Sequence, residues 1–148
     1  MHVSVQHIDE LQRAVSAIAK CSKPVVAAIH GPCIGGGVDI ACACDVRLAS
    51  SSASFSIREV AIGLAADLGT LQRAQHVFNN DSRLRELALT GADFGAAEAH
   101  KLGFLSRVIE PQDAADKAGA QAVRSAALEL AGTIAGENVP TRPSEPHR

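Results

Sequence analysis

Three acidic residues stand among apolar residues and glycines in the central part of the chain. They are Asp39, Glu59 and Asp67, and Asp67 follows Glu59 by eight residues. An unpaired carboxylate is costly to bury, so acids in such surroundings usually have a partner or a chemical task. A run of three glycines, residues 35–37, lies just before Asp39. The region from residue 31 to residue 67 is therefore the candidate site, and the other elements have to position it.

The glycine run is predicted to join a strand to a helix. Residues 25–29 form a short apolar run that ends at the turn signal of residues 30–32, and this pattern predicts a buried strand. Residues 38–44 predict a short helix. A strand, a glycine turn and a helix N-terminus in this order present backbone N–H groups to a ligand. The same glycines are also compatible with a tight turn that lets a helix pack closely.

Helices and strands alternate along the rest of the chain. Apolar periodicity and capping residues predict helices over residues 3–20, from Asp67 onward, over 84–90 after a start at 80–82, over 96–102, and over 113–134 with Leu128, Leu130 and Ile134 on its apolar side. Further strands are predicted over residues 45–50, 53–57 and 105–109, and a loop over 58–66. This alternation favours an α/β arrangement of layers.

Composition excludes several classes of protein. The chain has 148 residues with 47% hydrophobic content, which is typical of one domain. Its net charge is −2 and aromatic residues make up 3%, so the basic surface and stacking platforms of a nucleic-acid binder are missing. No apolar run approaches the ~20 residues of a membrane helix, and the first residues lack the pattern of a secretory signal. A soluble, intracellular protein is expected.

The residues that most often bind metal ions do not have ligand spacing here. The four cysteines, Cys21, Cys33, Cys42 and Cys44, lack the Cys-x-x-Cys pattern of zinc and redox sites, and we expect them to be reduced packing residues. The histidines likewise form no ligand motif. No metal site is predicted. Residues 137–148 hold three of the six prolines and almost no apolar residue, which predicts a disordered tail after a domain over residues 1–136.

A family resemblance rests on several stretches taken together. They are KPVVAAIHG at 23–31, GGGVD at 35–39, CDVR at 44–47 and AEAHKLGFLSRV at 97–108. The set resembles the signature of the crotonase superfamily, the enoyl-CoA hydratase and isomerase group, whose fold is a spiral of β-β-α units. Residues 59–73, EVAIGLAADLGTLQR, are similar to one branch in particular, the Δ3,5-Δ2,4-dienoyl-CoA isomerases. The resemblance covers roughly residues 5–131.

The resemblance implies a role for each matching residue. Gly36 matches a glycine whose N–H donates to the thioester oxygen and stabilises an enolate. Glu59 matches the principal acid/base group at C2 of the acyl chain, and Asp67 matches the second acid, which returns a proton at C6. Asp39 stands where hydratases carry a glutamate, and we expect it to tune the pKa of Glu59 by its charge.

The implied reaction converts 3,5-dienoyl-CoA to 2,4-dienoyl-CoA in fatty-acid β-oxidation. Two carboxylates suffice for it, so neither a metal nor a redox cofactor is expected, and the CoA belongs to the substrate. The implied partner is an acyl-CoA thioester, with no nucleic acid and no membrane. The implied compartment is the mitochondrion or the peroxisome, although the C-terminal residues 146–148 are not a Ser-Lys-Leu type of address and no other targeting signal is seen.

Each acid also has a structural interpretation. Asp67, which precedes a helical pattern, is on pattern alone more typical of an N-cap than of a catalytic acid. Glu59 beside Arg58 is compatible with a solvated loop acid. Asp39 in the first turn of a helix is compatible with a residue that complements the helix dipole.

The resemblance also implies parts that this chain lacks. Family members extend further at the N-terminus, where the other oxyanion donor and much of the CoA-binding surface lie, and they end in helices that join subunits into trimers or hexamers. We therefore expect a crotonase-like domain that is incomplete at both ends, in which the missing helices argue against such oligomers. Loss of one oxyanion donor is expected to lower the rate about 10²–10³-fold.

Two alternatives to the isomerase stay open. The first is an enoyl-CoA hydratase, against which Asp39 in place of glutamate and the presence of Asp67 both argue. The second is a non-catalytic subunit that keeps the fold and associates with full-length relatives.

Overall fold

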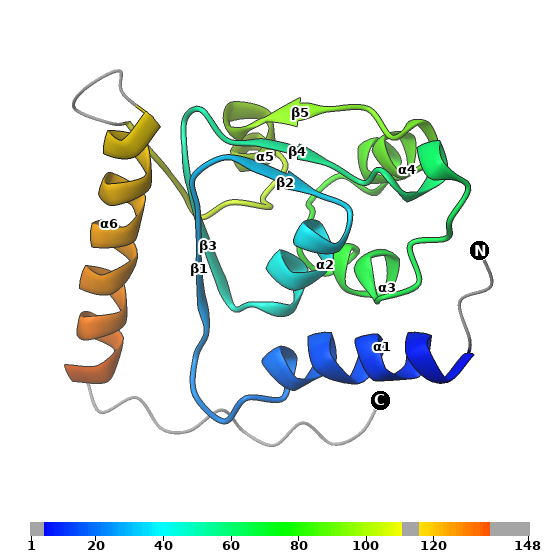
Figure 1. Ribbon diagram of the computed structural model, residues 1–148. Helices are drawn as coiled ribbons and strands as arrows, with labels where there is room; N and C mark the ends of the chain where they lie inside the picture. Colours follow the sequence, from blue (N-terminus) through cyan, green and yellow to red (C-terminus); the bar gives the residue numbers. More distant parts are fainter. Residues whose placement is uncertain (1–4, 111–115, 137–148) are drawn as a thin grey trace.

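The strands of this chain form two small sheets, and helices pack around them (Figure 1). A computed structural model describes residues 5–110 and 116–136. The helices are α1 (Val5–Ala19), α2 (Gly36–Ala43), the 3-10 helix η1 (Glu59–Ile62), α3 (Thr70–Ala74), α4 (Asp81–Thr90), α5 (Ala96–Lys101) and α6 (Asp116–Gly136). The strands are β1 (Val26–Ile29), β2 (Pro32–Ile34), β3 (Val46–Ser50), β4 (Ser54–Ser56), β5 (Phe94–Gly95) and β6 (Arg107–Ile109). The predicted α/β class is confirmed.

The chain passes from one sheet to the other twice in the same way. The first sheet has the order β1-β3-β6 with all strands parallel, and the second has the order β2-β4-β5, in which β4 is parallel to β2 and antiparallel to β5. Because β1 leads at once to β2, and β3 to β4, each pair turns a corner between the sheets. The second pair lies beside the first in both sheets, and α2 follows the first pair. This arrangement is the predicted spiral of β-β-α units.

Most predicted elements lie within a few residues of those observed, but the two-residue strand β5 was missed, and so was β2. The turn signal at residues 30–32 hid it, since only Cys33 and Ile34 follow before the glycine run. Pairing with β4, in which Cys33 lies opposite Phe55, makes these residues a strand. Pro32 is tolerated because it begins the strand. A three-residue strand defined by its neighbour leaves no periodic pattern in the sequence.

The long helix α6 presents a different face to the sheet from the one predicted. Its buried positions follow Gly119, Val123 and Ala127 at four-residue steps, whereas Leu128 is 62% exposed. A Cβ atom at Gly119 would lie 3.0 Å from Oγ of Ser50 in β3, so glycine permits this close approach. Figure 1 shows α6 beside β1 and β3. Small residues line the face that packs there, and Leu128 was placed wrongly. Leu130 and Ile134 are half-buried.

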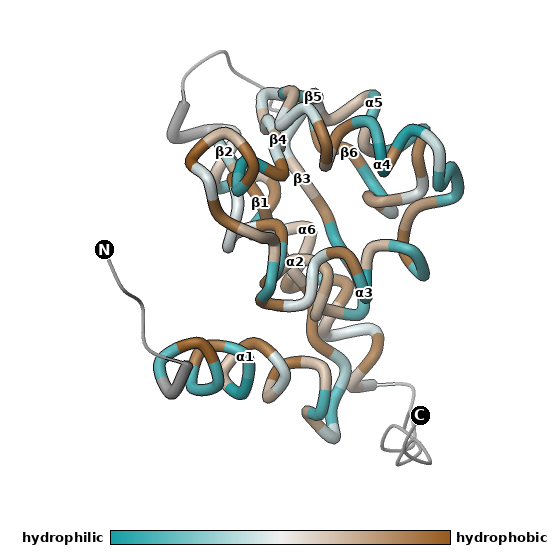
Figure 2. The backbone as a smooth tube through the Cα atoms, turned by 90° about the vertical axis from the view of Figure 1, so that its right-hand side faces the viewer, coloured by the Kyte–Doolittle hydropathy of each residue, from teal (hydrophilic) through white to brown (hydrophobic). Residues whose placement is uncertain are grey.

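Helix α1 is amphipathic, as its apolar periodicity predicted. Figure 2 shows hydrophilic and hydrophobic segments alternating along it. Val15 is buried, and the helix packs against α2. The predicted tail over residues 137–148 and the predicted start of α6 at residue 113 lie outside the described residues.

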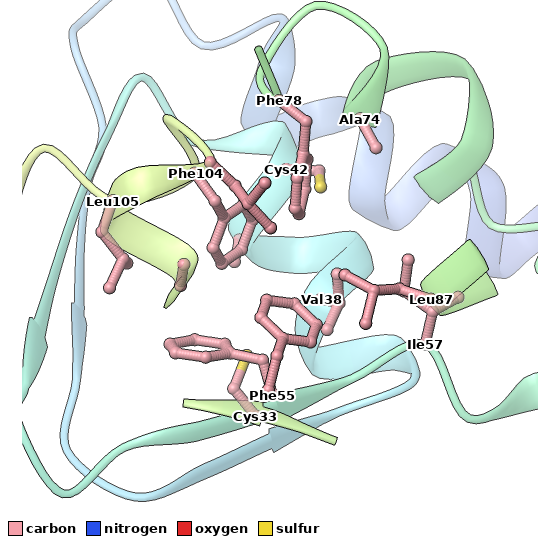
Figure 3. Packing of buried hydrophobic residues seen from close by; sticks show 14 of the residues in the cluster. Cys33, Val38, Cys42, Phe55, Ile57, Ala74, Phe78, Leu87, Phe104 and Leu105 are labelled. Carbon is pink, nitrogen blue, oxygen red and sulfur yellow. The ribbon is translucent and has the colours of Figure 1, made fainter. Parts of the chain in front are cut away.

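All four phenylalanines of the chain meet in the core between the second sheet and the helices (Figure 3). Phe104 is fully buried at their centre, with its ring centroid 5.0 Å from that of Phe78 and 5.3 Å from that of Phe55. Phe94 lies 5.5 Å from Phe55 by the same measure. Phe55 belongs to β4, and Phe104 follows α5, so this cluster ties segments that are far apart in the sequence.

Cys33, Cys42 and Cys44 are buried packing residues, as predicted, whereas Cys21 is half-buried. The four lie in the described part of the chain and form no disulfide. Burial raises the pKa of the Cys33 thiol to about 11 and that of Cys42 to about 12. Both thiols therefore stay protonated at neutral pH, and a protonated thiol is a poor nucleophile and a poor metal ligand.

Replacement of Phe104 by alanine is expected to destabilise the fold by about 3–5 kcal/mol, because it leaves a cavity amid three other rings. The free energy of unfolding, measured in urea, checks this. Leu128→Ala on the exposed face of α6 is the control and is expected to change that free energy by no more than about 0.5 kcal/mol. A loss below about 1 kcal/mol for Phe104→Ala would contradict the assigned core.

Candidate active site

The glycine turn lies where β2 meets α2. Gly35 has a φ of 52°, a left-handed conformation that favours glycine, and its N–H donates to the Ser56 carbonyl of β4 at 2.9 Å. Gly36 is the first residue of α2, so its N–H has no acceptor within the helix. A Cβ atom at Gly36 would meet nothing within 4 Å. The backbone at Gly36 is therefore open to the approach of a ligand.

Glu59 lies against this turn because β2 and β4 run parallel. Ile34 at the end of β2 pairs with Ser56 at the end of β4, so the residues after both strands meet at one edge of the sheet. Oε1 of Glu59 lies 3.0 Å from the position that a Cβ atom on Gly35 would occupy. Oε2 is buried and has no hydrogen-bond partner among the described residues.

The surroundings of Glu59 differ from those of a solvated loop acid. Its side chain is half-buried, and the predicted loop contains η1, which begins at Glu59. Arg58 forms an ion pair with Asp93. The guanidinium of Arg58 is therefore paired with another acid, so an ion pair with Arg58 does not explain the carboxylate at residue 59.

The pKa of Glu59 is raised above its ordinary value. Burial is the main cause, and the negative charges of Asp39 and Asp67 act in the same direction, while a hydrogen bond from the backbone N–H of Glu59 itself acts against them. The three acids singled out in the sequence thus share one electrostatic environment. A carboxyl group whose pKa is shifted toward neutrality is better matched to proton transfer than an ordinary one.

Asp39 is 1% exposed and joins α2 to α3. Its Oδ1 accepts a hydrogen bond from the backbone N–H of Thr70 at 2.7 Å and a second from the Thr70 hydroxyl. Its Oδ2 is buried without a partner among the described residues. The carboxylate therefore satisfies the N-terminus of α3, a helix that begins 31 residues further along the chain. The structural interpretation from the sequence had assigned it only to its own helix.

Asp67 is exposed and is not the N-cap of α3, which corrects the structural interpretation of this residue. The N-cap is Gly69, with a φ of 109° and no side-chain cap. Leu68 and Gly69 stand between Asp67 and the helix, and Asp39 accepts a hydrogen bond from the N–H of Thr70, the first residue of α3. The Asp67 carbonyl accepts a hydrogen bond from Nε2 of Gln12 in α1 at 2.6 Å.

The structure brings together the four predicted residues and adds two that sequence reasoning missed. Gly35, rather than Gly36, is the glycine that faces Glu59, and Thr70 is the partner of Asp39. The positive φ of Gly35 and the pairing of Thr70 with a residue 31 positions away have no local signal in the sequence. Within residues 5–110 and 116–136, no group of three or more histidine, cysteine or acidic side chains has the arrangement of a metal site. No helix in these ranges is long and apolar enough to cross a membrane.

Comparison with known proteins shows the family of this chain. Residues 5–133 match the family described as enoyl-CoA hydratase/isomerase. The chain belongs to this family. Among its relatives, the peroxisomal Δ(3,5)-Δ(2,4)-dienoyl-CoA isomerase of Arabidopsis thaliana is 52% identical over 68% of this chain. The mitochondrial enzyme of the same name from Mus musculus is 50% identical over 72% of it.

The fold of the family is also found in solved structures. A probable enoyl-CoA hydratase/isomerase from Mycobacterium abscessus has a TM-score of 0.78 and 31% identity, and the match covers 89% of this chain and 47% of that one. The crotonase-like fold predicted from the motifs is therefore confirmed. The match spans about a third of the length of the curated isomerases, 33% for the mouse enzyme and 36% for the Arabidopsis enzyme.

Glu59→Gln is expected to stabilise the chain relative to the wild type as the pH rises. Since the pKa of Glu59 is raised in the folded state, ionisation costs stability once the pH exceeds the ordinary value of 4.5, and this loss is complete above the folded pKa. Glutamine carries no such cost. Thermal unfolding between about pH 4 and pH 8 checks this.

The control for this experiment is Glu129→Gln, which removes one negative charge from an exposed position on α6. The difference in unfolding temperature between the wild type and Glu59→Gln should grow with rising pH and be absent near pH 4. A gap that narrows as the pH rises would contradict the raised pKa of Glu59.

Proposed function

We propose that this chain carries the proton-transfer groups of a 3,5-dienoyl-CoA to 2,4-dienoyl-CoA isomerase. The observation that carries the proposal is the Glu59 carboxylate, which lies against the glycine turn with one oxygen buried and unpartnered. Burial raises the pKa of this group, and the charges of Asp39 and Asp67 act in the same direction. Such a group is suited to accept a proton from a substrate that enters beside Gly36.

The reaction moves one proton and two double bonds. Glu59 removes a proton from C2 of the 3,5-dienoyl thioester, and the electron pair of the broken bond passes into the conjugated system to form a conjugated enolate with three C=C bonds. The Gly36 N–H donates to the thioester oxygen, where negative charge develops. Asp67 takes up a proton from solvent and delivers it to C6, and the double bonds come to rest at C2 and C4. Exchange with water restores both carboxyl groups.

The relatives support this reaction over the alternatives. Both isomerases named above share about half of their residues with this chain over the matched region. The shorter side chain of Asp39, where the resemblance places a hydratase glutamate, argues against activation of water. Those two relatives are named as mitochondrial and peroxisomal, so we extend the proposal to one of these compartments and to an acyl-CoA thioester as substrate.

The two acids are expected to be separable by experiment. Asp67→Asn removes the group that supplies C6, so it is expected to abolish the growth of conjugated-diene absorbance while solvent deuterium still exchanges at C2. Glu59→Gln removes the base and is expected to lower both rates, by about 10²–10⁴-fold. The measurement combines the absorbance assay on a 3,5-dienoyl-CoA with mass spectrometry of the thioester recovered from heavy water.

Asp93→Asn is the matched control for Asp67→Asn, since it removes an exposed carboxylate that pairs with Arg58 outside the site. It is expected to leave both rates within about twofold of the wild type. Addition of water to a 2-enoyl-CoA without any diene isomerisation would overturn the proposed reaction in favour of a hydratase.

A further inference from the structure

We propose that Thr70 is a positioning residue that sets the place of Asp67 relative to Glu59 by holding Asp39. This inference rests on the proposed isomerase, because Asp67 needs a fixed place only if it delivers a proton. Thr70 touches no reacting atom and acts through its neighbours.

The contact between Thr70 and Asp39 is buried and doubled. Thr70 is 0% exposed, and both its N–H and its hydroxyl donate to Oδ1 of Asp39. A backbone N–H alone would satisfy that oxygen and the start of the helix. Valine would fill the same volume without a second donor. The Thr70 hydroxyl therefore adds a hydrogen bond that fixes the orientation of the Asp39 carboxylate as well as stabilising the contact.

This contact connects the two halves of the site. Asp39 lies in α2, three residues after Gly36, and Thr70 begins α3, three residues after Asp67. Through it, the helix that presents the Gly36 N–H holds the helix that follows Asp67. A movement of α3 against α2 would change the distance between Asp67 and Glu59.

The segment between Asp67 and α3 is held from α1 as well. Gln12 donates to the Asp67 carbonyl, and Nη1 of Arg73 donates to the Leu68 carbonyl at 3.0 Å. Nη2 of Arg73 reaches Oγ of Ser16 in α1 at 2.9 Å. The arginine lies across Gly69, where a Cβ atom would come within 2.0 Å of Nη1.

These bonds hold the backbone while the Asp67 side chain stays exposed. Precise placement matters for a proton-transfer group, since an error of about 1 Å can cost about 100-fold in rate. Of the bonds that hold this segment, the pair made by Thr70 is the one buried from solvent, where a hydrogen bond is strongest. Thr70 is therefore the position at which the placement of Asp67 should be most sensitive to substitution.

Thr70→Val tests this, because it keeps the volume and the backbone donor and removes the hydroxyl alone. The ratio of diene isomerisation to deuterium exchange at C2 is expected to fall about tenfold, since C2 exchange needs only Glu59. Thr70→Ser restores the hydroxyl and is expected to restore the ratio. The matched control is Thr133→Val in α6, whose hydroxyl donates to the Glu129 carbonyl of the same helix. This variant is expected to leave the ratio unchanged.

A second measurement does not depend on activity. Amide hydrogen exchange over residues 66–70 is expected to quicken in Thr70→Val and to stay at the wild-type rate in Thr70→Ser and Thr133→Val. Equal loss of isomerisation and C2 exchange in Thr70→Val, or unchanged amide exchange, would overturn the positioning role. Failure of the proposed function gives a different result. Asp67→Asn would then leave the ratio of diene isomerisation to C2 exchange unchanged. The amide exchange measurement would still decide the role of Thr70.

Discussion

The Asp39 carboxylate is buried between α2 and α3, and the geometry of the site depends on it. Removing a carboxylate from water is costly unless donors replace the lost solvent. Thr70 supplies two donors, and one of them is the first N–H of α3, which itself needs an acceptor. Each element therefore satisfies a requirement of the other. The bond joins positions 39 and 70 and so determines where α3 begins, which in turn determines where Asp67 lies.

Two parallel strands bring the rest of the site to one edge of a sheet. Because β2 and β4 pair in parallel, the residues that follow them emerge side by side. Gly35 follows β2 and donates to the end of β4, and Glu59 follows β4 and returns against Gly35. The β-β-α repeat thus accounts for the meeting of a glycine turn and an acid. A side chain at Gly35 would occupy the space in which the carboxylate lies.

The electrostatics of the site follow from this crowding. Glu59 loses solvent against the turn and faces two further acids, and both effects favour its protonated form. Asp39 contributes charge from within the core, whereas Asp67 contributes it from an exposed loop. The acids thus differ in exposure and in hydrogen bonding. Such differences let carboxyl groups of similar chemistry take separate roles in one proton transfer.

The sequence by itself determined the α/β class, most of the elements, the family and the region of the site, because apolar periodicity, glycine turns and contiguous motifs are local. It also singled out the three acids, which are conspicuous as charges in apolar surroundings. The tertiary structure decided what is not local: the strands β2 and β5, the buried face of α6, the contact of Gly35 with Glu59, and the pairing of Asp39 with Thr70. Asp67 was interpretable as an N-cap from its neighbours alone. Only the fold shows that Asp39, 31 residues before Thr70, accepts the N–H of Thr70, because tertiary packing brings these two residues together.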